Sequence, residues 1–158
     1  MFRPMRRNKQ QVSADDCRAV LQTAKRGVLS VHGENGYPYG VPLNFVFDAQ
    51  TDTLYFHAAK EGHKLDAIRQ NDKVCFTAWN DGYKEPGDWA WHVTSVVAFG
   101  RAFLVDDPQE SDRFLRALAQ KYFPPEENVE DEMTRHAARV QMIAVRIEHM
   151  TGKLVHEK

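Results

Sequence analysis

Residues 36–64 read GYPYGVPLNFVFDAQTDTLYFHAAKEGHK, a segment in which two predicted β-strands precede a polar break. In the first predicted strand, residues 37–48, apolar side chains recur at every second position, as in a strand with one face against a core. These positions are Val41, Leu43, Phe45 and Phe47. Pro42 has no backbone N–H to offer a neighbouring strand, so this strand should have a free or irregular edge.

A turn is expected at residues 49–52, and the next predicted strand covers residues 54–58. Because side chains alternate along a strand, Leu54 and Phe56 should share one face, with Tyr55 and His57 on the other. The tight turn between the two strands predicts that they belong to an antiparallel sheet.

The polar break behind the second strand has the composition of a phosphate site. Lys60, His63 and Lys64 surround Gly62, directly before a predicted helix at residues 64–70. Backbone N–H groups at a helix start attract phosphate together with cationic side chains, and a glycine lets the backbone come close to the ligand. Basic loop residues that are simply solvated give the same pattern, so these residues alone leave both interpretations open.

The flanking sequence predicts further strands and helices. A first helix is expected over residues 14–26, with Ser13 as its N-cap and Asp16 in a capping box. Asp107, followed by Pro108, is typical of a later helix start. The other expected elements are strands at 27–32, 74–79, 89–104 (or two strands with a bend near Gly100) and 141–148, an Asn-Gly turn at 33–36, a loop at 80–88, and a helix at 126–139 after a stop at Pro124 and Pro125. This order predicts a mainly β fold of the α+β class, with an antiparallel sheet closed into a barrel.

Composition narrows the function classes. The chain has 158 residues, which fits one domain over residues 1–158, and 21 Lys and Arg against 22 Asp and Glu give a net charge of −1. That balance argues against nucleic acid or an anionic membrane as partner. The basic start (Arg3, Arg6, Arg7 and Lys9) is a local exception that could bind a phosphate or nucleic acid, although a solvated terminus or a strand lying on a partner subunit is the favoured interpretation. With no signal peptide or apolar span in the sequence, the expected location is the cytoplasm.

Several residues carry possible chemistry. His57, His63 and Tyr55 are candidate proton donors, because imidazole and phenol groups exchange protons readily. His57 and His63 lack a third ligand at useful spacing, so no metal site is predicted. The tryptophans Trp79, Trp89 and Trp91 fit three uses: stacking on an aromatic ligand, covering a dimer interface, or packing in the core.

Two segments carry a resemblance to a known family: Gly36-Tyr37-Pro38-Tyr39-Gly40-Val41-Pro42-Leu43, and residues 54–64. With the start of the chain (1–7), residues 95–100 and residues 147–153, they are similar to the 5-nitroimidazole-resistance (Nim) proteins. These belong to the pyridoxamine 5′-phosphate oxidase-like FMN-binding split barrels. The resemblance implies an antiparallel split barrel that forms a homodimer and holds FMN between its subunits. The stretch from Trp79 to Trp91 does not match the family pattern.

The resemblance also assigns FMN contacts. The loop from Lys60 to Lys64 corresponds to the phosphate-binding segment, two strands lie along the flavin ring, and Ser95 lies near the phosphate side. The implied cofactor-binding residues are Val41, Pro42, Leu43, Asn44, Tyr55, Phe56, His57, Lys60, Gly62, His63, Lys64 and Ser95.

Two functions from different classes follow. The first is a flavin-dependent oxidoreductase that passes electrons from NADH, NADPH or another protein to a small electrophile such as a nitroimidazole. The alternative is a noncatalytic flavin-binding or sensing protein, with haem binding by the same barrel as a third hypothesis. The sequence has no G-x-G-x-x-G fingerprint for a dinucleotide domain, which favours a reductase that receives its electrons from another protein, or a binding module.

Overall fold

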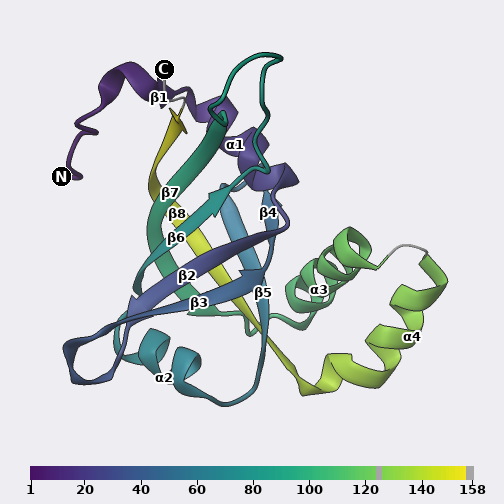
Figure 1. The fold of residues 1–158 in the computed structure, drawn as a ribbon. Coiled ribbons are helices and arrows are strands. Elements are labelled where there is room, and N and C mark those ends of the chain that lie inside the picture. Colours follow the sequence, from purple (N-terminus) through teal and green to yellow (C-terminus); the bar gives the residue numbers. More distant parts are fainter. Residues whose placement is uncertain (124–125, 156–158) are drawn as a thin grey trace.

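One curled antiparallel sheet forms the body of the protein, and its two ends approach each other to make a split barrel (Figure 1). The computed structural model describes residues 1–123 and 126–155, without the side chains of residues 126–128 and 132. Neighbouring strands follow the order β3-β2-β6-β7-β8-β5-β4, with β1 paired to β8. The strands are β1 Gln11–Val12, β2 Arg26–His32, β3 Pro38–Asn44, β4 Val46–Asp48, β5 Thr53–Ala59, β6 Lys73–Trp79, β7 Val93–Leu104 and β8 Val140–Val155.

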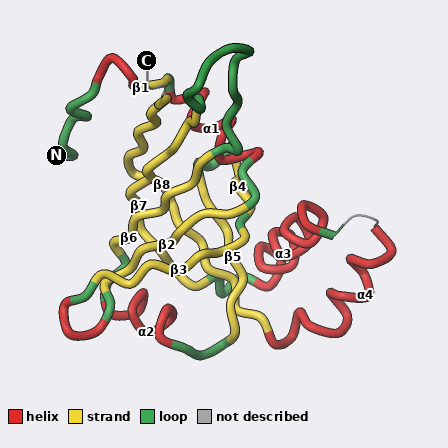
Figure 2. The backbone as a smooth tube through the Cα atoms, viewed as in Figure 1, coloured by secondary structure: helices red, strands yellow, loops and turns green. Residues whose placement is uncertain are grey.

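Helices lie at both ends of the barrel and along one side (Figure 2). The α-helices are α1 Ala14–Thr23, α2 His63–Gln70, α3 Pro108–Tyr122 and α4 Glu126–His136, and short 3-10 turns occupy Asn8–Gln10, Glu34–Gly36 and Ala137–Arg139. Helix α1 lies near the end of the barrel where β7 begins, α2 lies at the opposite end, and α3 with α4 lies beside β5 (Figure 1).

The core fills the inside of the curled sheet and follows from the alternation of its strands. Phe45, Phe56 and Phe76 are fully buried there, and Phe76 meets the other two rings edge-on at 4.8 and 5.2 Å between centroids. Leu21 of α1 and Leu65 of α2 close the two ends of this core. A second cluster on the outside of β5 and β8 holds α3, with Tyr55 and Phe114 at its centre.

Several local predictions are confirmed. Ser13 and Asp16 form the reciprocal capping box of α1, and the Asp107 carboxylate accepts a hydrogen bond from the Gln109 N–H at the start of α3. Strand β3 lies at an end of the sheet and pairs only with β2, which explains how Pro42 is tolerated. Instead of two strands, residues 93–104 form one strand with a register shift between Phe99 and Gly100.

Other boundaries differ from the prediction. Helix α1 ends at Thr23 rather than at residue 26, because Arg26 already pairs with Asn44 in the sheet. Strand β7 begins at Val93, so the loop before it extends beyond residue 88. Strand β8 continues to Val155 instead of ending at residue 148, since its second half pairs with the first half of β7. The stop assigned to Pro124 and Pro125 lies outside the described residues.

The single strand predicted for residues 37–48 is wrong: it breaks at Phe45. The Tyr122 hydroxyl accepts a hydrogen bond from the Phe45 N–H at 3.0 Å, and it lies within hydrogen-bonding distance of the Phe45 and Lys25 carbonyl oxygens. The Lys121 ammonium donates to the Phe45 and Ala24 carbonyl oxygens at 3.1 and 2.8 Å. Because α3 satisfies these backbone groups, the chain can leave β3 and enter β4 without a continuous ladder.

Lys121 makes the stability of this junction depend on pH. Burial lowers the pKa of its ammonium to about 8, below the value of about 10.4 in an unfolded chain. Between these values the unfolded state binds more protons, so the contribution of Lys121 to folding stability rises with pH. We expect the wild type to gain about 1–2 kcal/mol relative to Lys121→Met between pH 7.5 and 9.5, measured by urea denaturation. An equal pH dependence in both proteins would contradict this.

Candidate functional site

The edges of β3 and β5 face each other without a hydrogen-bonded ladder between them. Among residues 1–123 and 126–155, β4 pairs with β5 only over Thr53–Tyr55, and β3 pairs only with β2. This opening, the split, is bordered by residues 38–44 and 56–59. It brings together two stretches that the sequence predicted as neighbouring strands of one cofactor site.

At the α2 end of the split lies a pocket of about 220 Å³, the α2 pocket. Its lining residues are Tyr39, Ala58, Ala59, Glu61, Gly62, His63, Lys64 and Leu65. The predicted phosphate segment therefore forms a real concavity, although Lys60 is exposed and does not line it. The His63 ring stacks on Tyr39 at 4.3 Å between centroids, a contact that joins α2 to β3.

The start of α2 is suited to an anion. Gly62 precedes the helix with φ 136° and ψ 163°, and a Cβ atom placed on it would meet nothing within 4 Å. No side chain caps the helix, so its first N–H groups are open to a ligand. Glycine is needed here for backbone conformation, since only glycine adopts such angles without strain.

Lys64 supplies the positive charge. Burial lowers the pKa of its ammonium, and it forms no ion pair with any residue that the structure describes. The pKa of His57 is also lowered, first by loss of water around the ring and then by the nearby Lys64 charge. A partly buried, unpaired ammonium next to an uncapped helix start is stabilised by a bound anion such as phosphate.

Three predicted residues do not present their side chains to the split. Tyr55 is buried under α3, where its ring stacks on Phe114 and its hydroxyl donates to Glu110 at 2.7 Å. Burial and Glu110 raise its pKa, which makes it a poor proton donor. Phe56 points into the core and can offer a ligand only its backbone. Ser95 lies near the start of β7, at the end of the strand opposite α2, so one chain does not bring it to the phosphate segment (Figure 1).

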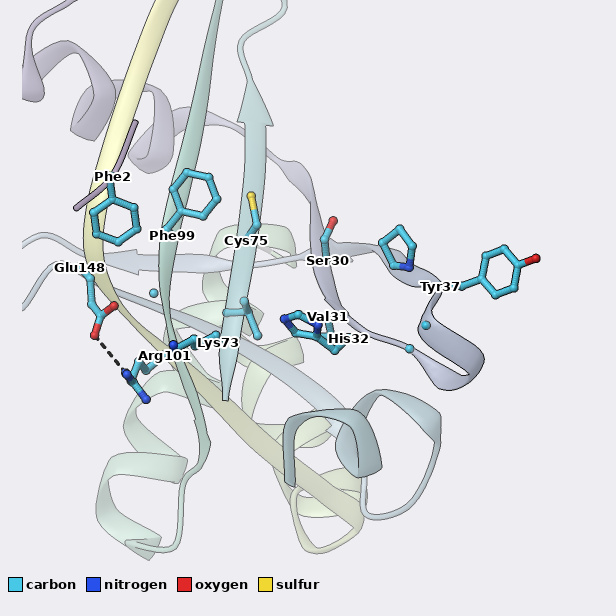
Figure 3. Close-up of a pocket in the computed structure, with 15 residues that line it drawn as sticks. Phe2, Ser30, Val31, His32, Tyr37, Lys73, Cys75, Phe99, Arg101 and Glu148 are labelled. Atoms are coloured by element: carbon cyan, nitrogen blue, oxygen red, sulfur yellow. Dashed lines mark hydrogen bonds and ion pairs between the residues drawn. The ribbon is translucent and has the colours of Figure 1, made fainter. Parts of the chain in front are cut away.

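A hollow larger than the α2 pocket lies on a different face of the protein (Figure 3). It has a volume of about 650 Å³ and is lined by the outer faces of β2, β6, β7 and β8, with Phe2 packed against Phe99 and His149. Ser30, Cys75 and Lys73 also face it (Figure 3). None of the predicted FMN contacts lines this strand-face pocket, which no pattern in the sequence had indicated.

The three tryptophans are at least 50% exposed, so the core interpretation is wrong for them. Trp89 and Trp91 extend from the loop before β7, which is held by paired backbone hydrogen bonds between Tyr83 and His92.

Within residues 1–123 and 126–155, no three His, Cys, Asp or Glu side chains gather as metal ligands. In the same part of the chain, no helix has the length and apolar character to cross a bilayer.

Comparison with known protein families identifies the family of this chain. A family model described as pyridoxamine 5′-phosphate oxidase matches residues 13–154. The chain belongs to this family. A search of curated proteins found no match.

Solved structures confirm the split-barrel fold predicted for this family member. One is a candidate 5-nitroimidazole antibiotic resistance protein of Bacteroides thetaiotaomicron, with 23% identity, a TM-score of 0.73, and coverage of 94% of this chain and 90% of that one. A FAD-binding protein of Mesorhizobium loti has 22% identity and a TM-score of 0.66, covering 92% and 96%. A FAD- and haem-binding protein of Mycobacterium smegmatis has 18% identity and a TM-score of 0.73, covering 92% and 73%. At these identities the likeness establishes the fold alone.

The backbone at Gly62 gives a test of the α2 pocket in this member of the family. Gly62→Ala should cost about 1–3 kcal/mol of stability, because φ 136° is strained for alanine even though its Cβ meets no atom. Relief of that strain would shift the first turn of α2 and weaken anion binding. Gly87→Ala is the matched control, with φ 83° and open space but in the loop before β7. Denaturation midpoints should show that both variants are less stable than the wild type. FMN titrations should show a lower FMN affinity only in Gly62→Ala. An FMN affinity that is unchanged in both variants would contradict the assignment of the α2 pocket as the anion site.

Proposed function

We propose that the protein binds FMN along the split, with the phosphate in the α2 pocket, and acts as a flavin-dependent oxidoreductase. The observation that carries this proposal is the partly buried Lys64 ammonium beside the uncapped start of α2. It lies at one end of the open edges of β3 and β5, where the Nim resemblance expects the phosphate of FMN.

Each part of the split has a role in this proposal. Lys64, His63 and the first N–H groups of α2 hold the phosphate, and Gly62 lets the backbone approach it. Val41, Pro42, Leu43 and Asn44 border the ring along the edge of β3, where Pro42 offers no N–H to a further strand. When bound, FMN supplies the electron transfer, and the protein supplies binding and orientation.

His57 is the residue proposed to handle protons. Its lowered pKa keeps the imidazole neutral at neutral pH, so the ring can donate a hydrogen bond from one nitrogen and accept a proton at the other. Tyr55 is not proposed for this role, because its hydroxyl is committed to Glu110. The electron acceptor is proposed to be a small electrophile such as a nitroimidazole, and the donor to be NADH, NADPH or a protein.

The functional unit is proposed to be a homodimer that uses the outer face of β6 and β7. Phe99 and Phe103 of β7 are 39% and 38% exposed on this face, beside the strand-face pocket. Large aromatic side chains exposed on one face of a sheet are typical of interaction surfaces, and interfaces of obligate dimers commonly bury more than about 2,000 Å². A partner subunit would also bring a second Ser95 and a second tryptophan loop, which a single chain does not bring to its own α2 pocket.

The absorption spectrum of the purified protein tests the proposal. We expect flavin bands, and FMN as the cofactor released on denaturation and identified by its mass. A haem spectrum, or FAD as the released cofactor, would contradict it. Oxidation of NADH or NADPH in the presence of a nitroimidazole separates the oxidoreductase from the alternative, a noncatalytic flavin-binding protein.

A further inference from the structure

A second concavity lies at the other end of the split, between the sheet and the two helices α3 and α4. This α3–α4 pocket has a volume of about 260 Å³. Most of its wall is apolar, formed by Leu115, Leu118, Ala119, Phe123, Met133, Ala137 and Val140. His57 of β5 and Asn44 of β3 border it on the sheet side. The α3–α4 pocket therefore meets the split at His57, the residue proposed to handle protons.

The polar residues of this pocket are few, namely Asn44, His57, Tyr122 and His136. The Tyr122 hydroxyl is already used by the backbone of Phe45 and Lys25. The His57 ring and the Asn44 amide have no hydrogen-bond partner among the residues described, so both can bond a ligand. The lining residues include no Lys, Arg, Asp or Glu among those described. A charged ligand would therefore lose its water with no carboxylate, ammonium or guanidinium group among the described lining residues to offset its charge, and only the imidazoles of His57 and His136 beside it.

The volume limits the size of the occupant. An apolar cavity of about 150 Å³ holds one benzene ring, whereas drug-sized ligands fill pockets of about 300–1,000 Å³. A pocket of about 260 Å³ lies between these limits. It suits a single substituted ring or a small bicyclic compound whose polar group reaches the sheet side.

We propose that the α3–α4 pocket binds a neutral single-ring or small bicyclic compound that carries one hydrogen-bonding oxygen at the His57 and Asn44 end. This inference rests on the proposed function, in which such a compound is the electron acceptor of the flavin. Specificity for the acceptor then comes from α3 and α4, and the polar contacts come from β3 and β5.

Three matched probes test the ligand class by NMR titration of the purified protein: benzamide, benzoate and acetamide. Benzamide has the neutral ring and the oxygen, benzoate carries a charge on the same ring, and acetamide lacks the ring. Benzamide should bind with a Kd below about 1 mM, as its size allows, with benzoate at least 10-fold weaker and acetamide not detected. Equal binding of benzamide and benzoate would overturn the neutral-ligand assignment.

Two variants locate the site. Ala137→Phe fills the pocket and should weaken benzamide binding at least 10-fold, whereas Ala138→Phe, at the adjacent exposed position that does not line the pocket, should leave it unchanged. If Ala137→Phe fails to fold, Leu115→Trp fills the same pocket from α3. Benzamide that binds equally to the filled and unfilled proteins, or does not bind the wild type, overturns the inference.

FMN titration of the same variants separates this inference from the proposed function. We expect the FMN Kd of Ala137→Phe to stay within 2-fold of the wild type, because residue 137 does not line the α2 pocket. A wild type that binds benzamide but no FMN would overturn the proposed function and leave the pocket assignment standing. A more than 10-fold loss of FMN affinity in Ala137→Phe would show that the two pockets are not separate sites.

Discussion

Replacing Lys64 with alanine is expected to weaken FMN binding by about 10- to 100-fold. The Lys64 ammonium is partly buried and has no described carboxylate partner, so a bound phosphate would be its main counter-charge. A hydrogen bond to a charged group contributes about 1.5–3 kcal/mol, and every 1.4 kcal/mol changes a dissociation constant tenfold. Riboflavin, which lacks the phosphate, should bind the variant and the wild type equally well.

Arg69→Ala is the matched control for this variant. It removes a cation from the same helix, but Arg69 lies in the last turn of α2 and pairs with Asp66 at 2.9 Å. Its FMN affinity should stay close to that of the wild type, and circular dichroism should find both variants folded. Wild-type affinity in folded Lys64→Ala would mean that the phosphate is held elsewhere.

Phe99→Glu is expected to convert the proposed dimer into monomers. The side chain is 39% exposed in the single chain, so a glutamate there should not prevent folding. In the centre of a subunit interface the same carboxylate would be buried without a partner, which costs about 3–5 kcal/mol. The dimer dissociation constant should therefore rise at least about 100-fold, as measured by analytical ultracentrifugation.

Gln120→Glu is the control for the added charge, since Gln120 is exposed on α3, away from the outer face of β6 and β7. This variant should remain dimeric. The monomeric Phe99→Glu protein should also lose FMN affinity if the partner subunit completes the site. A wild type that is monomeric at micromolar concentration, or a dimeric Phe99→Glu, would refute the proposed interface.

The local parts of the site could be predicted from the sequence because they depend on neighbouring residues. Alternation in residues 54–58 predicted that Leu54 and Phe56 share one face, which the structure places in the core, and the composition of residues 60–64 indicated the α2 pocket. The caps at Ser13 and Asp107 also depend only on residues within one turn. These features follow from spacing and from side-chain chemistry alone.

The remaining features depend on contacts distant in sequence. The break at Phe45 is caused by Lys121 and Tyr122, and no pattern within residues 37–48 indicates these two contacts. Tyr55 and His57 share a face of β5, yet α3 covers Tyr55 and leaves His57 at the split. Ser95 is predicted for the phosphate side but lies at the far end of β7 from α2. No local pattern states where a helix packs or which subunit supplies a residue.

The most direct test of the central claim compares FMN with riboflavin in fluorescence titrations of the cofactor-free protein. The two ligands share the same ring and differ in the phosphate, so the difference in their affinity measures the contribution of the α2 pocket. We expect FMN to bind at least about 10-fold more tightly, since one charge-assisted hydrogen bond contributes about 1.5–3 kcal/mol. Equal affinity for the two ligands would contradict a phosphate site at Gly62, His63 and Lys64.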